Sequence, residues 1–482
     1  MLDVRPIFFV IGSLLSILAA AMLAPLMADL ASGHPDWQVF AVSSALSLFF
    51  GVLLILTNNT PKISLNLRQT FVLTTSSWVV VCLFSSLPFM FSNIRLGFAD
   101  GFFEAMSGLT TTGATVIVGL DQVPPGILLW RALLQWLGGI GIVGMGIVIL
   151  PFLRVGGMQL FRSESSDKSD KVVPRAADLA FAFGWLYLTL TVACITALRL
   201  AGMSLFDAIC HAMTAVATGG FSTQDISIAY WASPAVEWIL ILFMTLSALP
   251  FVRYISLVKG DTNVLWQDSQ IRNFLGLIGF LSLTLAIYVH ATTEMTLADA
   301  VRLGAFHVVS ITTTTGFVAA DYTAWGPGPV VLFFILTLVG GCTGSTSGGL
   351  KIFRFEILWL SLRTQVNRLF SPRRVLPLTY NQKPVDADVI VSVMNFTFVY
   401  LALILVIALG MGMTGLDLET ALSGAATAVA NVGPGLGPII GPVGNFAPLQ
   451  DEAKWLMSLG MLLGRLELFT VLVLLSPDFW RS

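Results

Sequence analysis

The sequence predicts an all-α integral membrane protein of about ten transmembrane helices. Two extra N-terminal helices precede four pseudo-repeats of helix, re-entrant pore helix and loop, and helix, arranged around one central pore. Three observations predict this architecture. Of the 482 residues, 56% are hydrophobic and 11% are charged, whereas a soluble domain carries about 25% charged residues. Ten apolar segments are long enough to cross a bilayer, which takes about 20 residues. Four short polar segments lie between the members of the last four pairs of spans.

The expected spans are 6–28, 37–57, 70–92, 124–153, 176–200, 233–257, 270–292, 327–360, 386–411 and 453–476. The first run contains Ala19-Ala20-Ala21 and could be taken for a secretory signal. However, Arg5 is the only cation before it, and the run exceeds the roughly 7–15 apolar residues of a signal peptide. We therefore expect a membrane anchor. The predicted units are an N-terminal two-helix unit, 1–65, and pore repeats at 66–160, 161–262, 263–375 and 376–482.

One glycine occupies an equivalent place in each repeat: Gly113, Gly220, Gly316 and Gly433, separated by 107, 96 and 117 residues. Six residues before these glycines stand Ser107, Thr214, Ser310 and Thr427, and nine residues before them stand Glu104, His211, His307 and Gly424. The surrounding segments are about 98–115, 205–222, 297–318 and 416–435. Each segment is too short and too polar to cross a bilayer, so we expect a re-entrant helix that ends in a glycine loop.

The basic residues predict the orientation. The N-terminus, the C-terminus and the loops 58–69, 153–175, 253–272 and 351–385 together hold 19 of the 25 Lys and Arg residues. By the positive-inside rule this side is cytoplasmic, so both termini lie inside and the glycine loops open outside. The outside is acidic, with Asp100, Glu104, Asp207, Asp225, Asp299, Asp321, Asp417 and Glu419. A mouth of one charge sign concentrates counter-ions; the alternative is ordinary solvated loop charge.

The glycine loops suit the chemistry of an ion pore. A dehydrated alkali cation needs oxygen ligands, and a ring of backbone carbonyls supplies them. Glycine allows the positive φ that turns successive carbonyls one way, and re-entrant helices can direct their partly negative C-terminal ends at a central cavity. The alternative is that these glycines serve close helix packing. Four glycines at one offset within a repeat favour the pore.

The segments TTTGAT, ATGGFS, TTTTGF and NVGPG resemble the four degenerate filter loops of the Trk/Ktr/HKT potassium-transport superfamily. The similarity covers essentially the whole chain, and the two extra N-terminal spans resemble its bacterial Trk-type membrane subunits, the TrkH/TrkG type. The resemblance implies uptake of potassium and rubidium across the bacterial inner membrane, with K⁺ as the permeating ion and no organic cofactor in this chain. It also implies a homodimer and a cytosolic ring of nucleotide-binding (NAD/ATP) regulatory subunits. The basic loops 153–175 and 351–385 are candidate docking surfaces for that ring; the alternative is that the positive-inside bias alone accounts for their charge.

The resemblance assigns a K⁺ filter to Thr111, Thr112, Gly113, Thr218, Gly219, Gly220, Thr315, Gly316, Asn431, Val432 and Gly433, with Thr314 beside it. The second filter glycine is either Gly219 or Gly220. The match of Gly220-Phe221 with Gly316-Phe317 favours Gly220. In the plant branch a serine at the first position accompanies sodium permeation, so Gly113 favours potassium.

A second feature is GGCTGSTSGGLKIFRF, residues 340–355, inside the eighth span. Each interior glycine costs a helix roughly 1 kcal/mol relative to alanine, so we expect a broken helix with a loop below the filter. The alternative is a tight helix crossing built from small residues. The resemblance implies an intramembrane gating loop that includes Gly340, Gly341, Gly344, Gly348 and Gly349.

Several charged residues also lie at membrane depth. Arg465 lies mid-span, where a charge is costly and usually functional. The resemblance implies an electrostatic barrier near the gate, and the alternative is a structural ion pair. We expect Glu467, two residues on, to lie off the face of Arg465, and Arg131 to extend outward to the membrane surface. For His211 and His307 a structural, hydrogen-bonded role is favoured over a pH switch.

Two other function classes remain as alternatives. An alternating-access secondary transporter of another solute also has broken helices and repeats, and K⁺ uptake coupled to H⁺ or Na⁺ is equally compatible with the residues. A membrane enzyme would need a clustered nucleophile and base at depth, which the sequence does not suggest, so we expect no enzymatic activity. The net charge of −2 argues against nucleic acid as a partner.

Overall fold

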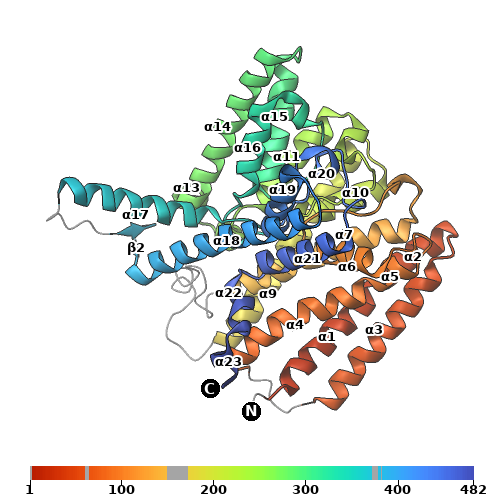
Figure 1. The fold of residues 1–482 in the computed structure, drawn as a ribbon. Helices are drawn as coiled ribbons and strands as arrows, with labels where there is room; N and C mark the ends of the chain where they lie inside the picture. Colours follow the sequence, from red (N-terminus) through yellow and green to blue (C-terminus); the bar gives the residue numbers. More distant parts are fainter. Residues whose placement is uncertain (1–2, 60–64, 149–171, 372–377, 382, 482) are drawn as a thin grey trace.

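The computed structural model describes residues 3–59, 65–148, 172–371, 378–381 and 383–481 (Figure 1). Most of the predicted docking loop 153–175 and residues 372–377 of the predicted docking loop 351–385 lie outside these ranges. Within them the chain is almost entirely helical, with one two-stranded hairpin.

The N-terminal unit holds α1 (Arg5–Ala21), α2 (Leu23–Ser32) and α3 (Trp37–Thr57). The first repeat holds α4 (Leu67–Ser85), α5 (Leu87–Phe91), α6 (Phe98–Leu109), η1 (Leu120–Gln122) and α7 (Pro125–Val148). The second holds α9 (Val172–Leu200), α10 (Leu205–Val216), η3 (Ser227–Trp231), α11 (Pro234–Ser247) and α12 (Phe251–Val258). The third holds α13 (Val264–Gln267), α14 (Ser269–Thr292), α15 (Leu297–Thr312), η4 (Tyr322–Trp325), α16 (Pro327–Thr337) and α17 (Ile352–Phe370). The fourth holds β1 (Thr379–Tyr380), β2 (Lys383–Pro384), α18 (Ala387–Met413), α19 (Leu418–Ala430), α20 (Gly437–Ile440), α21 (Asp451–Arg465), α22 (Phe469–Leu472), η5 (Val473–Leu475) and α23 (Pro477–Arg481).

Helices occupy the described residues of each predicted span, but three of the spans are broken, and only nine candidate spans are found there when each of two bent pairs counts as one. Among the described residues, seven helical segments are long and apolar enough to cross a membrane. The sixth span bends by 91° between α11 and α12, where Pro250 has no N–H to continue a helix. The tenth bends by 103° between α21 and α22, where Glu467 and Leu468 have positive φ angles. The eighth is broken between α16 and α17 by the predicted glycine-rich loop.

The four pore helices α6, α10, α15 and α19 are enclosed by a cyclic packing of the repeats. The second span of each repeat contacts the pore helix of the next: α7 contacts α10, α11 contacts α15, α16 contacts α19, and α21 closes the circle on α6. The C-terminal ends of the four pore helices therefore converge on one axis inside the protein. This arrangement confirms the predicted fold class.

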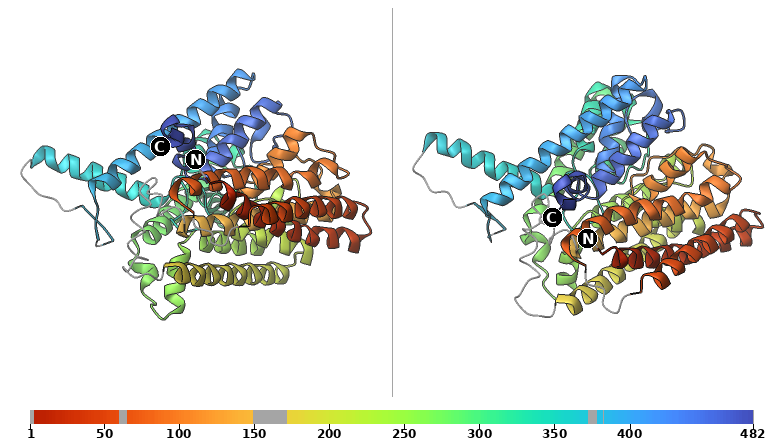
Figure 2. Two further views of the ribbon diagram at one scale, coloured as in Figure 1. Left: turned by 90° about the horizontal axis from the view of Figure 1, so that it is seen from below. Right: turned by 60° about the horizontal axis from the view of Figure 1, so that its bottom comes forward.

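The two ends of the described chain lie on the same side of the molecule (Figure 1). The Gln69 side chain at the start of α4 donates a hydrogen bond to the carbonyl of Asp3, and Phe71 makes an edge contact with Phe479 of α23. Figure 2 shows that α17 and the hairpin project from the helical body.

Candidate functional site

The four glycine loops share one backbone conformation. In each loop the N–H of the residue before the glycine donates to the carbonyl six positions before the glycine, at 2.8–3.1 Å. The residue two before the glycine has a left-handed φ of 51–59°, and the glycine itself has a φ of 75–114°. Each pore helix thus ends in the same reversal, which a glycine tolerates without steric cost.

The loops meet in a closed ring. A β-carbon placed on Gly113 would lie 2.1 Å from the carbonyl oxygen of Gly219, and one on Gly220 would lie 1.8 Å from that of Thr315. A β-carbon on Gly316 would lie 2.0 Å from the oxygen of Val432, and one on Gly433 would lie 2.8 Å from that of Thr112. Each glycine therefore lies against the carbonyl that precedes the next glycine, and the fourth loop returns to the first. In this ring Gly220 holds the place of Gly113, whereas Gly219 supplies a carbonyl.

Side chains behind the loops fix the segments that follow the glycines. The Glu104 carboxylate accepts from Val116 N–H at 2.9 Å, and His307 Nε2 accepts from the N–H groups of Ala319 and Ala320 at 3.2 Å. His211 Nε2 lies 2.9 Å from Ser222 Oγ. In the fourth repeat Gly424 has no side chain, and the neighbouring Ser423 accepts from Leu436 N–H instead. These contacts fit the expected structural role of the histidines.

Arg131 departs from its prediction. It is 1% exposed, and it does not extend to the membrane surface. Its Nε lies 2.7 Å from the Glu104 carboxylate, one terminal nitrogen donates to Ser222 O at 2.7 Å, and the guanidinium lies 4.0 Å from the Phe221 ring centroid. The apolar sequence around it suggested an anchor at the interface, but α7 turns this residue toward the ring, where a buried carboxylate compensates the charge.

On the side away from the termini, the ring opens into a cleft of about 510 Å³ that all four glycines line. Asp225 is the one residue of the predicted acidic group that lines it, and its carboxylate accepts from the N–H groups of Gly119 and Leu120. Asp100 pairs with Lys454, and Asp299 pairs with Arg302. The acidic mouth is therefore smaller than the sequence suggested, because several of its acids are engaged elsewhere.

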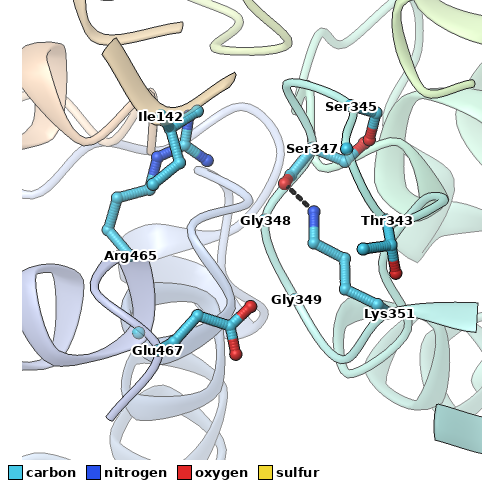
Figure 3. Close-up of a pocket in the computed structure, with 11 residues that line it drawn as sticks. Ile142, Thr343, Ser345, Ser347, Gly348, Gly349, Lys351, Arg465 and Glu467 are labelled. Atoms are coloured by element: carbon cyan, nitrogen blue, oxygen red, sulfur yellow. Dashed lines mark hydrogen bonds between the residues drawn. The ribbon is translucent and has the colours of Figure 1, made fainter. Parts of the chain in front are cut away.

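On the opposite side of the ring lies a second cavity of about 460 Å³, hereafter the inner cavity (Figure 3). The loop between α16 and α17 forms one wall. Thr346 Oγ1 lies 3.2 Å from Thr218 Oγ1, Ser347 donates to Thr313 O at 2.6 Å, and Gly348 N–H donates to Thr314 Oγ1 at 2.6 Å. The predicted gating loop is thus bound directly to the second and third glycine loops.

The fourth glycine loop also meets this wall. A β-carbon on Gly348 would lie 2.4 Å from Ala430 O, and Asn431 Nδ2 donates to Thr112 Oγ1 at 3.0 Å. Gly341, Gly344 and Gly349 belong to the same loop, and Gly340 begins it with an N–H that donates to Leu350 O. A continuous stretch of backbone therefore lies across the axis below the ring.

Three charged side chains line the inner cavity: Arg465 at the end of α21, Glu467 just after it, and Lys351 just before α17. Figure 3 shows Arg465 of α21 on one side and Lys351, whose Nζ donates to Ser347 O, on the other. Arg465 is 3% exposed, and its three guanidinium nitrogens have no hydrogen-bond partner among the described residues. Glu467 also lines this cavity, contrary to the expectation from helical spacing, because the helix ends at Arg465 and the chain reverses. Its carboxylate pairs with Arg354 of α17.

Sequence reasoning missed Gln135, which is buried on α7 one turn after Arg131. Its Nε2 donates to Gly219 O at 2.6 Å, and its Oε1 accepts from Phe221 N–H at 3.0 Å. A polar side chain in an apolar span was a usable signal, but the repeat pattern drew attention to the loops alone.

The fold and these cavities define a class of protein: a membrane protein with four pore repeats around one central pathway. The model of the TrkH family, described as cation transport proteins, matches residues 36–482. The chain belongs to this family.

It is 47% identical over 480 residues to the Trk system potassium uptake protein TrkI of Halomonas elongata, covering 99% of this chain and 97% of that protein. It is 38% identical to the Trk system potassium uptake protein TrkH of Vibrio parahaemolyticus, with 99% of both chains covered. The crystal structure of the potassium transporter TrkH from Vibrio parahaemolyticus superposes with a TM-score of 0.92 at 35% identity over 100% of both chains. The family predicted from the filter segments is thus confirmed.

Proposed function

We propose that this protein carries K⁺, and Rb⁺ as its close analogue, into the cell through the ring of four glycine loops. The observation that carries the proposal is the closed contact of each glycine with the carbonyl preceding the next glycine. A ring of carbonyls replaces the hydration shell of an alkali cation. Uptake is driven by the membrane potential, which supplies about 2.3 kcal/mol per charge per 100 mV.

The filter residues of this proposal are those assigned from the sequence, Thr111–Gly113, Thr218–Gly220, Thr315–Gly316 and Asn431–Gly433, with Gly220 as the second filter glycine. Support for potassium comes from the names of the relatives, which are potassium uptake proteins, and from glycine at the first filter position. The four parallel repeats around one axis favour a pore over an alternating-access carrier.

The gate of this proposal is the loop Gly340–Gly349. Its support is the set of hydrogen bonds from Thr346, Ser347 and Gly348 to the glycine loops. Arg465 acts as an electrostatic barrier in the inner cavity, since a buried guanidinium that pairs with no carboxylate in the described part of the chain repels an approaching cation. Opening requires the loop to leave the axis.

The remaining parts of the proposal concern assembly and placement. The protein lies in the bacterial inner membrane with both termini cytoplasmic, which the basic loops and the clustering of the two chain ends support. It works as a homodimer with a cytosolic nucleotide-binding subunit ring, as the family resemblance implies. The exposed Trp359 and Phe370 on the projecting α17 offer an apolar surface for the dimer. The units 1–65, 66–160, 161–262, 263–375 and 376–482 follow the repeats.

Cation flux into proteoliposomes tests the proposed function. Wild-type protein and Gly113→Ser are compared for K⁺, Rb⁺, Na⁺ and Cs⁺, alongside a variant with residues 343–346 deleted to open the gate. Flux that favours K⁺ and Rb⁺, with weaker discrimination against Na⁺ in Gly113→Ser, supports the filter. No cation flux even with the shortened loop would refute the pore.

A further inference from the structure

The four carbonyls of the ring are not equivalent. Among the described residues, no hydrogen bond reaches the carbonyl oxygens of Thr112, Thr315 or Val432. The fourth, Gly219 O, accepts a hydrogen bond of 2.6 Å from Gln135 Nε2. The amide of Gln135 also accepts from Phe221 N–H at 3.0 Å, so both of its polar atoms contact the second glycine loop.

The sequence of the second loop fits this contact. A β-carbon on Gly219 would lie 2.4–2.8 Å from the amide atoms of Gln135, which is too close for any other residue without displacing that side chain. Gly219 does not have a positive φ, unlike the ring glycine Gly220. The two glycines are therefore needed for different reasons. Gly220 leaves space for the Thr315 carbonyl in the ring, and Gly219 leaves space for the Gln135 amide.

The neighbouring contacts hold Gln135 in place. Arg131 lies one turn earlier on the same face of α7 and joins the Glu104 carboxylate to Ser222 O, both at 2.7 Å. The Glu104 carboxylate in turn accepts from Val116 N–H. The first and second loops are thus tied to one rigid helix, and the Gln135 amide cannot turn away from Gly219 without breaking its own bond to Phe221.

We propose that Gln135 is a positioning residue that sets the ion selectivity of the ring through the carbonyl of Gly219; the inference rests on the proposed function. A hydrogen bond donated to a carbonyl oxygen partly neutralises the negative charge of that oxygen, which makes it a weaker cation ligand. The bond also fixes the direction in which the carbonyl points. A ring with weaker, fixed oxygens favours the larger K⁺, whereas stronger or freer oxygens can close on the smaller, more strongly hydrated Na⁺. Removing the donor therefore favours Na⁺ relative to K⁺.

Three variants separate this role from simple packing. Gln135→Glu keeps the side-chain length and the acceptor for Phe221 N–H but, as a carboxylate, places a second acceptor oxygen where the N–H donor was. Gln135→Met keeps the length and removes both contacts. Gly219→Ala leaves residue 135 unchanged and displaces its amide. The matched control is Trp136→Phe, which removes a half-buried hydrogen bond to Thr191, 3.1 Å long, from the next position of α7.

The primary measurement is the thermal unfolding of full-length purified protein over a range of K⁺ or Na⁺ concentrations. Ions that bind the folded state raise the midpoint temperature of unfolding by an amount that depends on their affinity. Because this measurement reports ion binding and not ion flux, it does not require an open gate. A neutral hydrogen bond contributes about 1 kcal/mol, and we therefore expect the ratio of apparent K⁺ to Na⁺ affinity to fall about fivefold in all three variants. Trp136→Phe should lower the midpoint in both salts and leave the ratio unchanged. Flux ratios in the background lacking residues 343–346 should move in the same direction.

The outcomes distinguish the two proposals. Folded Gln135→Glu with a wild-type ratio would overturn the role of Gln135 while leaving the potassium filter intact. Loss of folding in both Gln135 variants would also overturn it, because the residue would then serve stability alone. The proposed function itself would be refuted if no alkali cation stabilised the wild-type protein and the variant lacking residues 343–346 carried no cation flux.

Discussion

An alanine series through the ring should produce graded damage that follows the measured approach of each glycine to its neighbouring carbonyl. The β-carbon of Gly220→Ala, Gly316→Ala or Gly113→Ala would lie 1.8, 2.0 or 2.1 Å from an oxygen, but that of Gly433→Ala would lie 2.8 Å away. A carbonyl must retreat by about 1 Å in the first three variants to reach a tolerable 3.0 Å contact, and by about 0.2 Å in the fourth. We expect K⁺ over Na⁺ selectivity to fall at least tenfold, about 1.4 kcal/mol, in the first three and less than threefold in Gly433→Ala.

All four substitutions share the strain of a left-handed residue, about 1–2 kcal/mol for a side chain with a β-carbon. Gly119→Ala is the matched control, because Gly119 has a φ of +75° and no atom within 4 Å of its would-be β-carbon. It should lose stability without losing selectivity. The assay is Rb⁺ uptake into proteoliposomes with Na⁺ as competitor, in the background lacking residues 343–346. Gly433→Ala as damaging as Gly220→Ala, or a selectivity loss in Gly119→Ala, would refute the reasoning.

Three further predictions concern the gate, the barrier and a pore helix. Ser347→Ala removes the hydrogen bond to Thr313 O, so basal Rb⁺ flux in the absence of the regulatory subunit should rise several-fold. Unchanged flux would show that this contact does not hold the gate closed. Arg465→Gln removes the Arg465 charge from the inner cavity, so inward K⁺ conductance in planar bilayers should increase, and a decrease would instead assign Arg465 to structure. The Asp417 carboxylate caps α19 by accepting from Thr420 N–H at 3.0 Å, and hydrogen bonding by Thr420 holds the pKa of Asp417 below its ordinary value. Its stabilising effect is therefore fully present above the ordinary aspartate pKa of 3.8 and disappears as the pH falls through the lowered pKa. In thermal unfolding, Asp417→Ala should cost about 1 kcal/mol at pH 7 and progressively less as the pH falls below 3.8; a cost that does not change over that range would contradict the capping role.

The sequence was sufficient to place the four loops because the repeat conserves what the backbone needs. The reversal after each pore helix uses a backbone bond to the carbonyl of the sixth residue before the glycine, and in the sequence a small hydroxyl residue marks that position in every repeat. The break in the eighth span was equally predictable from the sequence, because five glycines in ten residues strongly destabilise a helix. These features are local, and local rules predict them.

The errors and omissions arise where contacts join distant segments. Arg131 was predicted to extend outward because its own neighbours are apolar, and only the tertiary packing shows Glu104 behind it. Glu467 was placed away from Arg465 by helical spacing, which no longer applies once the helix ends at Arg465. Gln135 could not be connected to Gly219 from spacing, since 84 residues separate them. No periodicity encodes a contact of that kind.

A pore formed by one chain need not be symmetric, and the described contacts show where symmetry is lost. The backbone of the four loops is nearly the same, but the groups behind them are an acid with an arginine, two histidines, and a serine shifted by one position. Below the ring, the glycine-rich loop binds the second and third loops through hydroxyl groups, while the fourth holds the first through Asn431. The shared backbone must therefore provide the coordination common to all four positions, and the unequal supports provide separate control. Gln135 acts on selectivity through the second loop, whereas Ser347 and Thr346 reach the second and third loops from the gate. If this division holds, combining Gln135→Glu with Ser347→Ala should change selectivity and basal flux additively, and a strong deviation from additivity would show that filter and gate move as one unit.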